Sequence, residues 1–159
     1  MENFSYFCFL FMAIMLVMSA CTTPKKAKVG LVVLKGRWLV VAASGEAIAT
    51  SVEGIPYVEF DLLNRHISGN AGLNAFTADF LHINGKKESL QISKIETTSP
   101  SVEHCSLPID SYLLDSNLAA MQEQILSALS GVQEFAQQSN GTVVLLDRFG
   151  DQALMLKRT

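Results

Sequence analysis

Charged side chains are scarce in this sequence. They make up 17% of the residues, and the formal net charge at pH 7 is −3. Nucleic-acid-binding domains neutralise phosphates with clustered Lys and Arg, so this weakly acidic balance argues against a nucleic-acid partner. Apolar residues form 49% of the chain and crowd toward its beginning, where Glu2 is the one charged residue among the first twenty. The length fits a targeting segment followed by one domain.

No apolar run at the beginning of the chain is long enough to span a bilayer. Residues 7–17 form an unbroken apolar stretch of 11 residues, whereas a membrane-spanning helix needs roughly 20. A run of this length is typical of the hydrophobic region of a secretory signal peptide. The leader also lacks Lys and Arg, which is unusual for a signal peptide and leaves the true start codon open.

The residues after this run, Met18-Ser19-Ala20-Cys21, resemble the bacterial lipobox, with Met18 in place of the usual Leu. The resemblance implies cleavage between Ala20 and Cys21 and attachment of diacylglycerol to the Cys21 thiol. Acyl chains contribute about 0.8 kcal/mol per buried CH2, so two or three chains would hold the protein on a membrane. The alternatives are a plain signal peptide and a short anchor helix. We therefore predict a signal peptide over 1–20, a polar tether over 21–28 and a domain over 29–159.

Cysteines are too few for a disulfide framework in the mature chain. Of the three, Cys8 leaves with the leader and Cys21 is the lipidation candidate, so Cys105 is the one free thiol. Small exported domains that lack a good core usually depend on several disulfides. This domain must therefore be stabilised by its apolar core.

Short strands are predicted over most of the domain, because Val, Leu and aromatic residues cluster or alternate there. The expected strands cover 29–34, 37–42, 57–60, 66–68, 76–83, 90–95, 143–146 and 153–156, with turns at Asn64-Arg65, Asn84-Gly85 and 147–150. The aromatic and branched side chains expected inside the fold are Trp38, Phe60, Phe76, Phe80, Ile92 and Leu145.

One segment has helical periodicity. Its apolar stripe consists of Leu118, Met121, Ile125, Leu129 and Val132, a spacing that places them on one face of a helix. Asp115 or Ser116 is expected to cap this helix, and Gly131 and then Asn140-Gly141 to end it. A sheet and a helix each have one apolar face to bury. The predicted class is therefore α+β, mainly antiparallel β: a small curled sheet or open β-barrel with one amphipathic helix packed on it.

Five short motifs in this order resemble the META domain family (HslJ-like bacterial lipoproteins). They are 34–40 around Gly36 and Trp38, 69–76 with Gly69, Gly72 and Asn74, Thr97-Thr98 followed by Cys105, the helix over 123–135, and the hairpin over 147–156. The resemblance implies a small antiparallel barrel or curled sheet with one helix, an envelope location and no known enzymatic reaction. Leu73 stands where many members have Cys, so the disulfide that those members form with a cysteine near position 105 is not expected here.

Residues that could carry chemistry do not converge in the sequence. His66, His82 and His104 fall on separate segments, and none has the spacing of a metal site. His104 and Cys105 would point in opposite directions on an extended segment, which disfavours a catalytic pair. We expect no catalytic residue, no metal and no cofactor.

A few other polar and glycine positions have ordinary structural explanations. Glu59, Asp61 and Asp79 can share one face of the sheet as solvated carboxylates. Gly69 and Gly72 are expected to supply positive φ or a bulge. Asn74 is expected to bond the main chain across a bend, with ligand contact as the alternative.

Three function classes remain open. The first is a non-catalytic envelope lipoprotein that acts through protein contacts, in an assembly or chaperone-like role. The second is a barrel that binds a lipid or another apolar small molecule inside, and the third, least favoured, is an enzyme. The expected partners are a membrane, through the lipid on Cys21, and an envelope protein, with the chain itself a monomer. Thr22 replaces the Asp that retains many such lipoproteins at the inner membrane, so an outer-membrane location is expected.

Overall fold

The computed structural model describes residues 30–48, 55–83, 86, 88–98 and 109–159, with side chains of the last range described from residue 116 onward. The predicted signal peptide and tether, including Ala20 and Cys21, lie outside these residues, as do Asn84-Gly85, His104 and Cys105. None of the helices within the described ranges is both long enough and apolar enough to cross a membrane.

The described chain is mainly antiparallel β with one α-helix. A short 3-10 helix, η2, comes first at Leu31–Leu34. The strands are β1 (Gly36–Ala43), β2 (Glu46–Ala47), β3 (Tyr57–Asp61), β4 (His66–Asn70), β5 (Ala75–Leu81), β6 (Gln91–Thr97), β7 (Val132–Gln137), β8 (Val143–Asp147) and β9 (Gln152–Arg158). The α-helix, α2, spans Ile109–Ser130 between β6 and β7.

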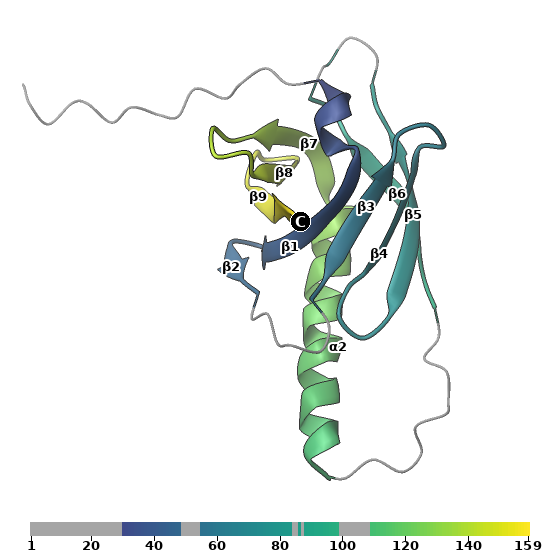
Figure 1. Ribbon diagram of the computed structural model, residues 1–159, viewed down its shortest axis with the longest axis vertical. Coiled ribbons are helices and arrows are strands. Elements are labelled where there is room, and N and C mark those ends of the chain that lie inside the picture. The colour runs from purple at the N-terminus through teal and green to yellow at the C-terminus, as the bar shows by residue number, and fades with distance from the viewer. Residues whose placement is uncertain (1–29, 49–54, 84–85, 87, 99–108) are drawn as a thin grey trace, which may run out of the picture.

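The strands form one sheet in the order β6-β5-β4-β3-β1-β9-β8-β7, with β2 paired to the end of β1. Every neighbouring pair is antiparallel, and β1 joins the two halves because it pairs with β3 on one side and β9 on the other. The sheet curls into a half-barrel, with β3–β6 on one side and β7–β9 on the other (Figure 1). The prediction of a small curled antiparallel sheet with one helix is confirmed.

The two outer strands of the curled sheet, β6 and β7, approach each other, and residues 88–90 just before β6 bond to β7. The Leu90 main-chain N–H donates to Gln133 O at 2.9 Å, and the Phe135 N–H donates to Glu88 O at 2.9 Å. Ser89 and Glu134 form an isolated antiparallel bridge at the same place. These bonds pair part of the main chain that an open sheet edge would leave unpaired.

The interior of the curl is filled with large apolar side chains. The predicted interior residues Trp38, Phe60, Phe76, Phe80, Ile92 and Leu145 are all buried. The rings of Phe60 and Phe80 meet edge to face with centroids 6.1 Å apart, a favourable aromatic geometry. Ile125 and Leu129 of α2 join the same core. The apolar stripe of the helix is therefore a core face.

The helix begins earlier than predicted, and it ends at the first of the two predicted ends. It starts at Ile109, so Asp115 and Ser116 lie inside it rather than at its cap. It stops at Ser130, so the predicted end at Gly131 is confirmed, whereas the apolar stripe had continued as far as Val132. Figure 1 shows that the first turns of α2 extend past the strands, while its later turns pack on the curled sheet.

The strand β7 follows α2 directly, and it begins at a residue that the sequence pattern assigned to the helix. In β7, Val132 is buried as predicted, but it pairs with Asp147 across the sheet instead of lying on a helix. Pairing with the apolar strand β8 overrides the helical spacing, because a sheet position buries this side chain as well as a helix would. Asn140-Gly141 therefore turns one strand into the next, with Asn140 Oδ1 accepting the Thr142 N–H at 2.9 Å.

The predicted strand over 29–34 is also wrong in its described part. Residues 31–34 form the 3-10 helix η2, with N–H groups of Val33 and Lys35 bonded to the carbonyls of Gly30 and Val32. Both sides of β1 are already occupied by β3 and β9, so no neighbouring edge is free for this segment. The turn instead places Leu34 in the core, where it is fully buried.

Candidate functional site

One outward face of the sheet carries a row of paired polar side chains. Arg37 on β1 is in register with Glu59 on β3, and their Nε and Oε2 atoms lie 3.2 Å apart. The Arg37 guanidinium also stacks 4.1 Å from the centroid of the Tyr57 ring. Both charged side chains are about half exposed, so the pair orders the surface more than it stabilises the fold.

A second row crosses the same face nearer the β3–β4 turn. Asp61, His66 and Asp79 are successive cross-strand partners on β3, β4 and β5. His66 Nδ1 lies 3.3 Å from Asp79 Oδ1, and Lys94 Nζ lies 3.0 Å from Asp79 Oδ2. The lysine bond, followed by the His66 bond, lowers the pKa of the Asp79 carboxyl. The prediction that Glu59, Asp61 and Asp79 share a face is therefore correct.

Asp61 shapes the turn that follows it. Its Oδ1 accepts the main-chain N–H groups of Leu63 and Asn64 at 3.0 and 3.2 Å, and its Oδ2 accepts the Asn64 side-chain amide at 2.6 Å. The Asn64 side-chain bond is the main reason that the pKa of Asp61 is lowered. Arg65 completes the turn with a φ of +54°. The carboxylate thus holds the β3–β4 turn in one shape and presents Leu63 to solvent.

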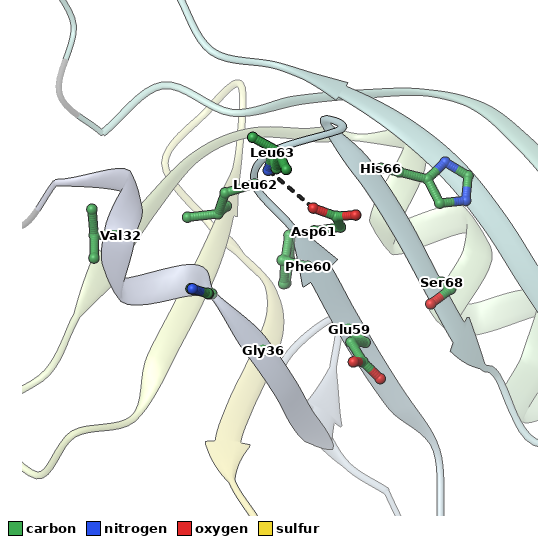
Figure 2. Close-up of a pocket in the computed structure, with 10 residues that line it drawn as sticks. Val32, Gly36, Glu59, Phe60, Asp61, Leu62, Leu63, His66 and Ser68 are labelled. Atoms are coloured by element: carbon green, nitrogen blue, oxygen red, sulfur yellow. Dashed lines mark hydrogen bonds between the residues drawn. The ribbon is translucent and has the colours of Figure 1, made fainter.

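A groove of about 860 Å³ lies between this turn and η2 (Figure 2). Its lining residues are Val32, Lys35, Gly36, Glu59, Phe60, Asp61, Leu62, Leu63, His66 and Ser68. In Figure 2, Val32 lies on the η2 side, while Leu62 and Leu63 lie on the turn and the polar side chains of β3 and β4 lie along the other margin. This groove, with an apolar rim and a polar side, is the candidate functional site.

The carboxylates in and near the groove are bonded to other groups of the chain. Asp61 is already bonded to its own turn, and Asp79, on the strand next to His66, is bonded to Lys94. Among the described residues, no three His, Cys, Asp or Glu side chains are grouped so as to hold a metal ion.

Two predicted motif residues hold the chain where η2 meets β1. Gly36 has a φ of +98°, a conformation that L side chains rarely adopt, and so it redirects the chain from η2 into the strand. Trp38 is fully buried, and its Nε1–H donates to Leu34 O at 2.8 Å. Arg158 covers the indole with its guanidinium carbon 5.1 Å from the ring, and its Nη2 donates to Lys35 O at 3.1 Å.

The two glycines of the second motif act differently from each other. Gly72 has a φ of +121°, as predicted, and a Cβ there would lie 2.5 Å from Met121 Cε. Gly69 lies within β4 without positive φ, and its strand is in regular register with β3 and β5. The expectation of positive φ or a bulge at Gly69 is wrong. Glycine is required there because a Cβ would overlap Tyr57 O and lie 2.8 Å from Phe76 Cε1.

Asn74 makes its hydrogen bonds at this bend through its main chain. Its N–H donates to Gln122 Oε1 of α2 at 2.8 Å, and its carbonyl accepts the Ala71 N–H at 3.1 Å. The side chain that bonds main chain across this bend is Asn70, whose Oδ1 accepts the Gly72 N–H at 2.7 Å. The prediction named the right bend but the wrong asparagine.

The other histidine in the described chain has a structural partner. His82 Nδ1 lies 2.8 Å from the Ser89 carbonyl oxygen. The buried Ser89 hydroxyl accepts the Ile83 N–H at 2.8 Å and lies within bonding distance of the Ile83 and Lys86 carbonyls. These bonds tie the segment after β5 to the segment before β6, so His82 and Ser89 organise a connection between strands.

The sequence patterns did not indicate several residues of the site. Lys94 forms an ion pair with Asp79, and Val32 and Leu63 form the apolar rim of the groove. The Asp61–Asn64 spacing was a usable signal, because an Asp followed by a turn residue commonly bonds the main chain two or three residues on. Lys94 could not be matched to Asp79 from the sequence, because the bulge between β5 and β6 alters their register.

Comparison with known proteins informs the fold alone. No family model matches the sequence, and no curated protein matches it. The chain is similar to an NMR structure of a protein from Burkholderia xenovorans, with 17% identity and a TM-score of 0.61 over 89% of this chain and 94% of that one. At this identity the similarity speaks for a shared architecture.

Proposed function

We propose that this chain is a non-catalytic lipoprotein of the bacterial envelope whose META-like domain acts through contacts with another envelope protein. The chain would be held by lipid on Cys21, most simply at the outer membrane, with an assembly or chaperone-like role. The finer fold class that goes with this proposal is an α+β open barrel of the META type. The proposed motif positions support it, since Gly36, Trp38, Gly69 and Gly72 each have a specific structural role.

The observation that carries the proposal is the filled interior of the curled sheet. Trp38, Phe60, Phe76 and Phe80 are each no more than 2% exposed and occupy the space that a bound lipid would need. Small barrels hold a ligand only where side chains leave room for one. The groove of 860 Å³ lies outside this interior, on the surface beside η2. The outward polar face, as a surface for protein contact, therefore accounts for the described residues better than an internal ligand site.

The outward polar face supplies the second part of the argument. Its charges are arranged in bonded pairs across five strands, so the surface is ordered before a partner arrives. Such preorganisation lowers the entropy cost of association. Electrostatic complementarity to a partner would then determine specificity more than affinity.

Site-specific photocrosslinking in native envelopes tests the protein-contact role. A photoreactive amino acid at Thr77, an exposed position on the polar face, should give a covalent adduct with one defined envelope protein. The same residue at Asp151, which lies outside this face, is the matched control and should give no such adduct. Adducts of equal yield at both positions, or co-purified lipid without any protein adduct, would contradict the proposal.

The anchor is tested separately. Cys21→Ser should prevent labelling by an alkyne palmitate analogue and should block normal processing of the leader. If the Cys21→Ser protein is processed like the wild type and remains with membranes, the lipoprotein part of the proposal is wrong.

A further inference from the structure

The most exposed large apolar side chains at one end of the sheet flank a single groove. Leu63 on the β3–β4 turn is 91% exposed, and Val32 on η2 is 77% exposed. They come from segments about thirty residues apart in the sequence, yet both line the groove of Figure 2. We call the surface formed by Val32, Lys35, Leu63 and Arg65 the η2 end.

Two cationic side chains at the η2 end lie outside the ion pairs of the described residues. Lys35 lines the groove, Arg65 lies in the turn, and neither is in an ion pair with any described residue. Of the acidic neighbours, Glu59 pairs with Arg37, whereas Asp61 accepts three hydrogen bonds from neutral groups of its own turn and keeps its negative charge. The two cations outnumber this one unpaired carboxylate, and exposed apolar tips beside a small excess of positive charge are typical of a surface that rests on anionic lipid.

The η2 end is also where the N-terminal segment joins the domain. Residue 30 leads directly into η2, and Cys21 precedes it by nine residues, which span at most about 32 Å when extended. A lipid on Cys21 would therefore keep the η2 end within that distance of the bilayer. At such an effective concentration, even weak contacts with lipid head groups are occupied.

We infer that the η2 end lies on the membrane surface, with Leu63 and Val32 in the interface and Lys35 and Arg65 against anionic head groups. The inference rests on the proposed lipid anchor and adds an orientation to it. The α2 end of the domain, formed by residues 71–74, the middle of α2 and the β8–β9 turn, would then face away from the membrane.

The experiment uses the full-length protein with an environment-sensitive fluorescent amino acid placed at Leu63 or at Val32. Phe149 at the β8–β9 turn is the matched control, because its side chain is 73% exposed but belongs to the α2 end. Each protein is reconstituted with vesicles of phosphatidylethanolamine and phosphatidylglycerol, or of phosphatidylcholine alone. The probes at Leu63 and Val32 should shift to the blue on the anionic vesicles, and the probe at Phe149 should not.

The charge contribution is measured with the Leu63 probe in a Lys35→Gln/Arg65→Gln background. Its blue shift should decrease on anionic vesicles and should not change on neutral ones. Absence of a shift at Leu63, an equal shift at Phe149, or insensitivity to the double substitution would overturn the inference. Mass spectrometry of the N-terminal peptide reports acylation of Cys21 independently, so failure of the anchor and failure of the η2-end contact are distinguishable.

Discussion

The core of the curled sheet is covered by different means at its two ends, the η2 end and the α2 end. At the η2 end, the cover is local: Leu34 and Trp38 fill the space, and the indole N–H bonds a carbonyl four residues earlier. At the α2 end, the cover comes from a distant helix, whose Gln122 and Gln124 bond the main chain at Asn74 and Ala43.

This difference indicates how each end should respond to substitution. The η2 end depends on a large buried ring, so loss of its packing should cost the most. The α2 end depends on polar bridges and on close approach of the helix at Gly72, so single changes there should cost less. Four predictions test this order, from the largest expected effect to the smallest.

Trp38→Ala should lower the free energy of unfolding by about 3–5 kcal/mol, the usual cost of removing a fully buried large aromatic side chain. Urea denaturation followed by far-UV circular dichroism measures it. Should the variant fail to fold, Trp38→Phe retains most of the burial and removes the indole hydrogen bond to Leu34 O, with an expected cost of about 1–3 kcal/mol. Phe149→Ala, an exposed control, should change stability by less than about 0.5 kcal/mol. Equal effects of Trp38→Ala and Phe149→Ala would contradict the packing argument.

Gly72→Ala should cost about 2 kcal/mol, because the backbone has positive φ and the new Cβ would displace Met121. Gly150→Ala is the matched control: its φ is also positive, at +84°, but the space around it is open. It should cost only the backbone strain, about 1 kcal/mol. Thermal or urea unfolding that shows no difference between the two variants would argue against close helix approach at Gly72.

Gln122→Ala should lower the free energy of unfolding by about 1 kcal/mol, since it removes one hydrogen bond to the Asn74 N–H. Glu123→Ala, at the exposed neighbouring position, should have almost no effect. Hydrogen exchange at the Asn74 amide should also become faster in the Gln122 variant alone. If the amide remains equally protected, the bridge does not hold the two elements together.

The smallest expected effect is electrostatic. The bond from Lys94 to Asp79 lowers the folded-state pKa of that carboxyl, so its contribution is present above the unfolded-state pKa of about 3.9 and is lost as the pH falls through the lower folded value. Stability should therefore decrease as the pH is lowered below about 4, and Asp79→Asn should make this decrease shallower. Denaturant midpoints across this range measure the slope, and an unchanged slope in Asp79→Asn would rule out the carboxyl as its source.

Several features of the fold and of the candidate site could be predicted from the sequence. Burial of Phe60 and Phe80 follows from period-two alternation, and the Asp147 turn between β8 and β9 follows from its residue types. The shared face of Glu59, Asp61 and Asp79 also follows from alternation along strands. These features depend on near neighbours in the chain, where spacing carries the information.

Other features required the tertiary structure. Val132 continues a helical stripe, yet it lies in β7 because pairing with β8 satisfies the main chain on a sheet. Gly69 could not be explained from its own segment, because the atoms that exclude a Cβ belong to Tyr57 on β3 and Phe76 on β5. The groove was likewise not predictable, because its two apolar sides come from η2 and the β3–β4 turn.

By itself, the sequence determined the alternation that builds a curled sheet, the single helix that covers it and the turns that connect its strands. Only the tertiary structure decided where the helix gives way to β7, how each end of the core is covered and which exposed side chains gather at the η2 end. The reason is physical: periodicity and turn chemistry act over a few residues, whereas strand pairing and packing join residues far apart in the chain.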